Sequence, residues 1–174
     1  MVLSWLSKTP KSDLPLDVLV TPPLVTTLAV VLLPFAGAVL APFAVRFAGE
    51  RAGYYAAAVA LVCLALVARL ASFGEAGRGT VAVEWLPSLD VVLALHVDGL
   101  ALLIAFLASG VGVLVFTYSA GYMHDEPGLA KYYATLLAFM GSMLGVALAG
   151  DLIALFVFWE LTSVSSFLLI GHYT

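Results

Sequence analysis

Glu160 is the only charged residue between Leu152 and Ile170, a stretch that is otherwise apolar apart from four hydroxyl side chains. If this stretch crosses a bilayer from Leu152, Glu160 lies eight residues inside it. At ~1.5 Å per residue the carboxylate is then ~12 Å deep, near the middle of a ~30 Å hydrocarbon core. An ionised carboxylate there costs at least ~2.5 kcal/mol, and such residues usually mark an ion or proton pathway. The alternative is a protonated side chain that only hydrogen-bonds between helices.

Composition independently indicates an integral membrane protein. The 174 residues are 63% hydrophobic and 10% charged, whereas a soluble domain is about half apolar and about a quarter charged. The formal net charge of −4 and the lack of a basic cluster give no reason to expect nucleic acid. The sequence shows no zinc-ligand spacing, nucleotide-binding loop or nucleophile elbow, so we expect no cofactor, no metal and no soluble-type active site. Cys63, the lone cysteine, is expected to be a buried apolar residue.

The apolar runs predict an all-α polytopic membrane protein with five transmembrane helices. Pro34 predicts a kink in the first span, and Pro42 either ends that span or bends it again. Asp98 is placed as the N-cap of the third. The predicted spans are residues 24–45, 54–71, 98–123, 131–149 and 152–171.

Residues 1–23 are predicted to form an extramembrane or interfacial segment that precedes a transmembrane region over residues 24–174. A cleaved signal peptide is the alternative for the start of the chain. The first apolar run continues to Val45, which is too long for a signal-peptide core, so we predict a retained span.

A short extramembrane β-hairpin is predicted within residues 72–97, between the second and third spans. Residues 80–85 alternate weakly between apolar and polar side chains, residues 86–90 have turn composition, and residues 91–97 are rich in aliphatic residues. Open sheet edges are not tolerated in lipid, so the hairpin belongs at or beyond the membrane surface.

Hydroxyl side chains follow Glu160 along the fifth span. Ser163 lies on the same helical face as Glu160, and Thr162 and Ser166 are further candidates to line a pathway. Ordinary helix packing by Ser and Thr remains an equally open alternative. Asp151 and His172 stand at the two ends of the span and are candidate entry or boundary residues. The interior of the spans offers no Lys or Arg to pair with Glu160.

Small residues punctuate two other spans. Gly141 and Gly145 are spaced so that a helix can approach closely, and we expect packing within the chain rather than dimerisation. Gly110 and Gly112 are interpreted as packing residues, with a flexible point as the alternative.

Several motifs in order resemble the antiporter-like family shared by multisubunit Mrp-type sodium/proton antiporters and respiratory complex I. They begin at Glu84-Trp85 and Asp98-Gly99, continue through Tyr122-Met123, and end with the segment 159–171 around Glu160. The hydroxyl-rich residues 161–166 are most similar to the large A-type component of the Mrp antiporter. The resemblance is to the amino-terminal part of that component only. His96 and Asp151 depart from the family pattern, which often has Arg and Asn there.

This resemblance implies a component of a multisubunit monovalent cation (sodium)/proton antiporter in which Glu160 is the proton relay of the fifth helix. It also implies partners: other membrane subunits of the same complex, the lipid bilayer, and sodium and protons as transported ions. The location would be the cell membrane, multi-pass, with the amino terminus and the hairpin on the outer side; basic residues alone do not decide the orientation. Because the chain ends at a span boundary, we expect a piece of a longer protein.

Two other functions remain open. The chain could be a proton-pumping membrane subunit of an NADH–quinone oxidoreductase, which is a redox enzyme complex. It could also be a structural membrane subunit without transport of its own.

Overall fold

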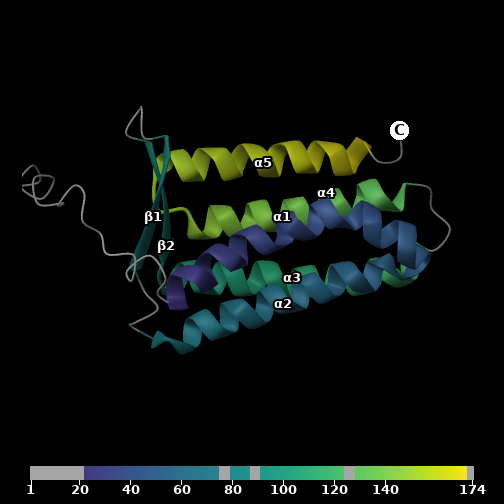
Figure 1. Cartoon of the computed structure of the whole chain (residues 1–174), viewed down its shortest axis with the longest axis horizontal. Helices are drawn as coiled ribbons and strands as arrows, with labels where there is room; N and C mark the ends of the chain where they lie inside the picture. Colours follow the sequence, from purple (N-terminus) through teal and green to yellow (C-terminus); the bar gives the residue numbers. More distant parts are fainter. Residues whose placement is uncertain (1–21, 75–78, 87–90, 124–127, 172–174) are drawn as a thin grey trace, which may run out of the picture.

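The computed structural model describes residues 22–74, 79–86, 91–123 and 128–171. Within these residues, five helices run up and down side by side, and a two-stranded hairpin lies across one end of them (Figure 1). All five helices are long and apolar enough to cross a membrane, so the predicted architecture is confirmed. In chain order the elements are α1 (Pro22–Ala48), the 3-10 turn η1 (Gly49–Arg51), α2 (Ala52–Ser72), β1 (Gly79–Leu86), β2 (Val91–Val97), α3 (Gly99–Tyr122), α4 (Leu129–Leu148) and α5 (Leu152–Ile170).

The first helix is longer than expected from its prolines. Both Pro34 and Pro42 lie inside α1, which continues to Ala48. Membrane helices tolerate proline because neighbouring groups satisfy the freed backbone carbonyls, so Pro42 does not end the helix. The bend at Pro34 stays a prediction. The predicted extramembrane segment 1–23 lies outside the described residues, except for Pro22 and Pro23, which open α1.

Aspartates set the start of two helices. Asp98 caps α3, as predicted, by accepting a hydrogen bond from the Ala101 amide at 2.7 Å. Asp151 caps α5 in the same way through the Ala154 amide, also at 2.7 Å. Each carboxylate satisfies an amide that the helix itself leaves without a partner, and its charge suits the positive end of the helix dipole.

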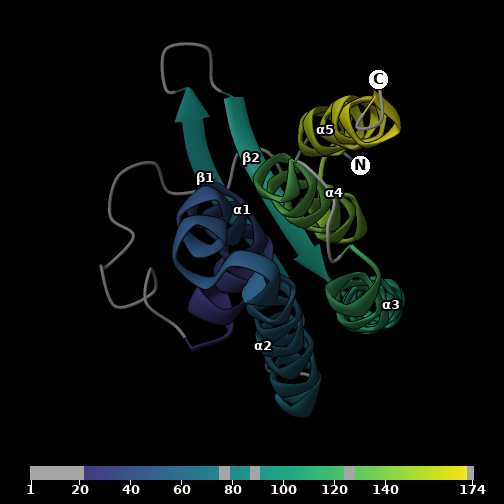
Figure 2. The ribbon, with the colours of Figure 1, turned by 90° about the vertical axis from the view of Figure 1, so that its right-hand side faces the viewer.

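Helix α4 is the central helix of the bundle, in contact with α1, α3 and α5 (Figure 2). Its glycines permit these contacts. A Cβ on Gly141 would lie 3.0 Å from the Phe35 ring of α1, and a Cβ on Gly145 would lie 2.3 Å from the Phe158 ring of α5. The expectation of packing within the chain is therefore confirmed for this pair. In α3 it holds for Gly112, which lies against Met140, and not for Gly110, which has open space around it.

The hairpin pairs β1 and β2 antiparallel, with Ala82 opposite Ala94 and an irregularity between Glu84 and Leu86. Its second strand, β2, is in contact with the ends of α3, α4 and α5. An isolated antiparallel bridge joins Leu95 of β2 to Ala149, in the turn between α4 and α5. The hairpin is thus fastened to the bundle at the point where α5 begins.

Candidate functional site

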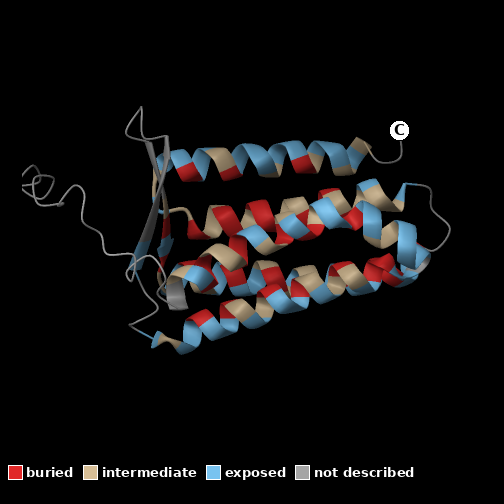
Figure 3. Ribbon diagram, in the orientation of Figure 1, coloured by how far each residue is buried: buried red, intermediate tan, exposed pale blue. Residues whose placement is uncertain are grey.

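Helix α5 lies at the edge of the bundle, beside α4 (Figure 2). It buries three residues, Ala154, Phe158 and Ser165. Most of its remaining surface is exposed in the described structure (Figure 3). This helix therefore presents a broad uncovered face, and the candidate site lies on it.

Glu160 is exposed and lies on the side of α5 away from α4. At 100° per residue it stands roughly opposite the buried residues of the helix. Its neighbours on that face are large, apolar and exposed: Phe156 is 64% exposed, Val164 53% and Phe167 74%. The described residues give the Glu160 carboxylate neither a hydrogen bond nor an ion pair.

The three predicted lining residues share one groove. Thr162, Ser163 and Ser166 of α5 line a hollow of about 500 Å³ together with Trp159 and three apolar residues of α4. Those three residues are Phe139, Met143 and Val146. Glu160 does not line this groove, but Ser163 lies one turn after it on the same side of the helix. Ser163 thus links the carboxylate to the hydroxyl-lined groove.

The hydroxyls of this region are bonded to their own helix. Thr162 donates to the Trp159 carbonyl at 2.6 Å, and Ser163 contacts the same carbonyl at 3.3 Å. Ser165 donates to the Leu161 carbonyl at 2.7 Å and is buried. Such bonds use the hydroxyl hydrogen and leave the lone pairs of the oxygen able to accept further hydrogen bonds. Thr162 and Ser163 could therefore accept from a water molecule in the groove, whereas Ser165 serves packing.

The two predicted boundary residues fare differently. His172 lies outside the described residues. Asp151 does stand at the start of α5. Its carboxylate accepts a hydrogen bond from the Ala154 amide at 2.7 Å and another from the Ala94 amide of β2 at 2.5 Å. The bond to the hairpin was not predicted, because nothing in the sequence pairs residue 94 with residue 151.

Trp159 was also missed as a groove residue. It is 60% exposed and follows Phe158, which packs into the bundle. Because Trp159 stands in an apolar run, its position in the sequence does not indicate which side of the helix it lies on.

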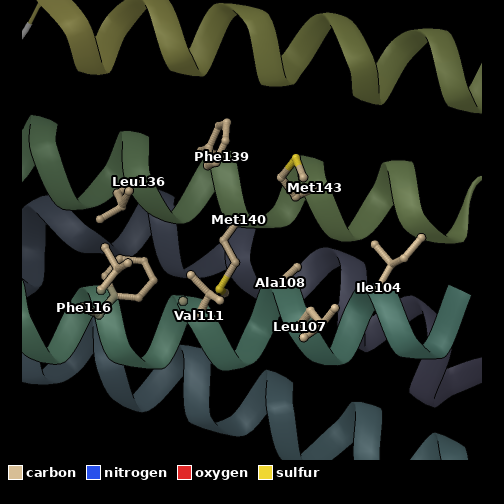
Figure 4. Close-up of a pocket in the computed structure, with 11 residues that line it drawn as sticks. Ile104, Leu107, Ala108, Val111, Phe116, Leu136, Phe139, Met140 and Met143 are labelled. Carbon is tan, nitrogen blue, oxygen red and sulfur yellow. The ribbon is translucent and has the colours of Figure 1, made fainter.

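A second hollow lies between α3 and α4 and is apolar. It has a volume of about 350 Å³, and Figure 4 shows side chains of both helices around it, among them Leu107, Val111, Phe116 and Met140. Phe139 and Met143 line this hollow as well as the groove beside α5. All the side chains that line it are apolar, so they include no oxygen or nitrogen atom that could bind a proton or a cation.

The described residues contain no group of three or more His, Cys, Asp or Glu that could hold a metal ion. The chemistry on offer is a single titratable carboxylate, a row of hydroxyls next to it, and apolar surroundings. Five helices that are long and apolar enough to cross a membrane define a polytopic membrane protein.

Comparisons with known proteins narrow this class. A family model described as NADH-ubiquinone oxidoreductase (complex I), chain 5 N-terminus, matches residues 85–133. The A/B component of a probable K(+)/H(+) antiporter from Rhizobium meliloti is 44% identical over an alignment of 148 residues, which covers 82% of this chain and 14% of that protein. The A component of the Na(+)/H(+) antiporter from Alkalihalophilus pseudofirmus is 41% identical over 80% of this chain and 18% of that protein.

Solved structures agree with these matches. The Mrp complex from Dietzia sp. DQ12-45-1b contains a chain that superposes with a TM-score of 0.73 and 34% identity, over 83% of this chain and 16% of that one. A chain of the membrane-bound sulfane sulfur reductase, an archaeal respiratory membrane complex, superposes with a TM-score of 0.70 at 19% identity, over 81% of this chain and 29% of that one. The second likeness shows the fold alone.

The chain belongs to the antiporter-like family and matches the amino-terminal part of the A-type components of Mrp-type cation/proton antiporters. It spans 14% to 18% of the length of the curated relatives named above.

Proposed function

We propose that this chain is part of a multisubunit monovalent cation/proton antiporter and that Glu160 relays the proton. The observation that carries the proposal is the placement of Glu160, halfway along a membrane-length helix, on an uncovered face and one turn from a groove lined by hydroxyls. The similarity to an antiporter component over 82% of the chain supports it. On this proposal the chain is a transporter subunit rather than an enzyme.

The physical basis is the high free energy of an ionised carboxylate in an apolar environment. The ionised form is favoured when a cation approaches and disfavoured when the cation withdraws. A positive charge that moves toward and away from Glu160 would therefore make it release and take up a proton. Thr162, Ser163 and Ser166 would hold the water that carries the proton along the groove.

The transported cation is proposed to be sodium. The relative from Alkalihalophilus pseudofirmus is named for sodium, whereas the one from Rhizobium meliloti is named for potassium. We also propose that the amino terminus and the hairpin lie on the outer side of the cell membrane, and that the chain works with other membrane subunits.

The decisive experiment replaces Glu160 in the complete antiporter complex. Glu160→Gln keeps the size and the hydrogen bonding of the side chain and removes its titration. We expect proton-coupled exchange to be lost with both sodium and potassium while the complex still assembles. Glu160→Asp shortens the reach by about 1.5 Å and should retain partial activity. Glu50→Gln, in the turn between α1 and α2, is the matched control and should behave as the parent.

The structural alternative for Glu160 predicts a different result. A carboxylic acid that stays protonated and only donates a hydrogen bond would be replaced by Gln with little loss. Normal exchange by a correctly assembled Glu160→Gln complex would therefore rule out the relay.

A proton-pumping subunit of an NADH–quinone oxidoreductase is the second candidate, favoured by the family model that matches residues 85–133. Purification of the intact complex distinguishes the two. Co-purifying flavin and iron–sulfur subunits would favour the oxidoreductase, and a complex of membrane subunits without them would favour the antiporter.

A further inference from the structure

The carboxylate of Asp151 joins two elements that are distant in sequence. Its Oδ1 accepts from the Ala154 amide, which caps α5, and its Oδ2 accepts from the Ala94 amide in β2, 57 residues earlier in the chain. Asp98 makes the same kind of capping bond at the start of α3. Among the described residues, it has no counterpart of the bond to Ala94.

Backbone contacts reinforce the junction. The Gly150 amide donates to the Ala94 carbonyl at 2.8 Å, so both backbone groups of Ala94 are bound by consecutive residues of the α4–α5 turn. These groups belong to the edge of β2 that does not face β1, where an unpaired strand edge would otherwise remain. The fit is close, because a Cβ on Gly150 would lie 3.1 Å from the backbone nitrogen of His96 and 3.2 Å from the carbonyl oxygen of Ala94.

We propose that Asp151 is a positioning residue, which fixes the start of α5 to the hairpin and thereby sets where Glu160 stands in the membrane. This inference rests on the proposed function. Glu160 follows Asp151 by nine residues, which is ~13.5 Å of continuous helix. A continuous helix held at its first turn is hindered from sliding or rotating about its axis, so the tie fixes the depth and the direction of Glu160. Helix α5 depends on this tie because it lies at the edge of the bundle, with α4 on one side (Figure 2).

Replacing Asp151 by Asn separates the tie from the cap. Asn has one acceptor oxygen, so it can accept from Ala154 or from Ala94 but not from both. Because Asn is as good an N-cap as Asp, we expect the oxygen to stay on the Ala154 amide, with the NH₂ group facing the Ala94 amide as donor against donor. Asp98→Asn is the matched control, because the capping bond is kept there and no bond to a strand is lost. Gly150→Ala tests the same tie by steric means, without a change of charge.

The first measurement is amide hydrogen–deuterium exchange in the assembled complex. Loss of a hydrogen bond to a charged acceptor should speed exchange of the Ala94 amide by about tenfold or more in Asp151→Asn, with no such change in Asp98→Asn. Unchanged protection of Ala94 in both Asp151→Asn and Gly150→Ala would overturn the tie. This measurement does not depend on transport, so it stands even if the proposed function fails.

The second measurement is the pH profile of exchange activity. A displaced Glu160 meets a different environment, so the midpoint of the profile should shift in Asp151→Asn and Gly150→Ala and stay in place in Asp98→Asn. Among the described residues near the tie, the other titratable ones are His96 of β2, Glu84 of β1 and Asp98 at the start of α3. Lys131, Tyr132 and Tyr133 lie at the far end of α4. Adding His96→Gln to the Asp151→Asn variant and to the Gly150→Ala variant should leave the shift of the midpoint unchanged.

The outcomes separate the hypotheses. Faster Ala94 exchange together with a shifted midpoint supports the positioning role. Faster Ala94 exchange with an unmoved midpoint overturns it and leaves Asp151 a purely structural residue. If Glu160→Gln itself retains normal exchange, the relay fails, and with it the positioning role, while the amide data still decide the tie.

Discussion

Gly145 shows how a single missing side chain holds two membrane helices together. The Phe158 ring of α5 lies where its Cβ would be, at 2.3 Å to Cδ1 and 2.4 Å to Cγ. Both atoms are near the root of the ring, so rotation of the ring cannot relieve the clash and α5 must move away. Because lipid is as apolar as the helix surfaces, this packing is a main source of helix association.

We therefore predict that Gly145→Ala destabilises the contact between α4 and α5 by ~1–3 kcal/mol. Gly110→Ala is the control, because a Cβ there meets nothing within 4 Å; it should be neutral or stabilising by up to about 1 kcal/mol. Thermal or denaturant unfolding of the complex measures both. Shrinking the opposing ring with Phe158→Leu should restore part of the stability lost in Gly145→Ala, and failure of this rescue would show that the contact is not limiting.

Among the elements, the hairpin and the α1–α2 turn lie at opposite ends of the bundle (Figure 1). Each end offers an exposed position for a cysteine label: Thr80 on β1, and Phe47 near the end of α1, which is 86% exposed. The native Cys63 is buried and should add little background.

With the hairpin on the outer side, a membrane-impermeant maleimide added to intact cells should label a Thr80→Cys variant. The same reagent should label a Phe47→Cys variant only after the membrane is opened, since that site would face the cytoplasm. The reverse pattern would invert the proposed orientation. Labelling of both sites from outside would contradict an odd number of spans between the two ends of the bundle.

The elements themselves were predictable from run length. A bilayer requires long apolar stretches, and five such stretches separated by polar turns leave little choice of fold. The end of α1 was less predictable, because the effect of Pro42 depends on whether neighbours satisfy the freed carbonyl. The cap at Asp98 was predicted from an Asp just before an apolar run. The same signal at Asp151 indicates a cap, and its bond to Ala94 depends on how a distant hairpin folds back.

The direction in which Glu160 faces could not be predicted for a related reason. Helix α5 is apolar on every side apart from its hydroxyls and Glu160, so the sequence has no polar stripe that marks the exposed face. Contacts with other elements determine it, namely the packing of Phe158 against Gly145 of α4 and the bond of Asp151 to Ala94 of β2. The hydroxyls could be predicted as a cluster because they are close together in sequence. Which of them line the groove and which, like Ser165, are buried depends on how α5 is rotated about its axis.

At the scale of the whole molecule, the described residues form only one side of the candidate site. Glu160 and the apolar face around it point away from the bundle, and no described residue offers the carboxylate a counter-charge. In lipid this face would hold a carboxylate at a cost of ~2.5–3.5 kcal/mol when ionised. The chain also spans 14% of the Rhizobium meliloti relative's length. A working relay therefore needs further membrane segments that cover α5.

We accordingly predict that residues 1–174 alone do not exchange cations for protons. The purified chain in proteoliposomes should insert and remain helical, which circular dichroism checks, yet show no sodium- or potassium-driven proton movement above that of empty vesicles. Without a cation that approaches and withdraws, the proposed relay has no means of coupling. Adding the remaining membrane subunits should restore exchange, and Glu160→Gln in that restored complex should abolish it again. Robust exchange by the isolated chain would show instead that residues 1–174 suffice for transport.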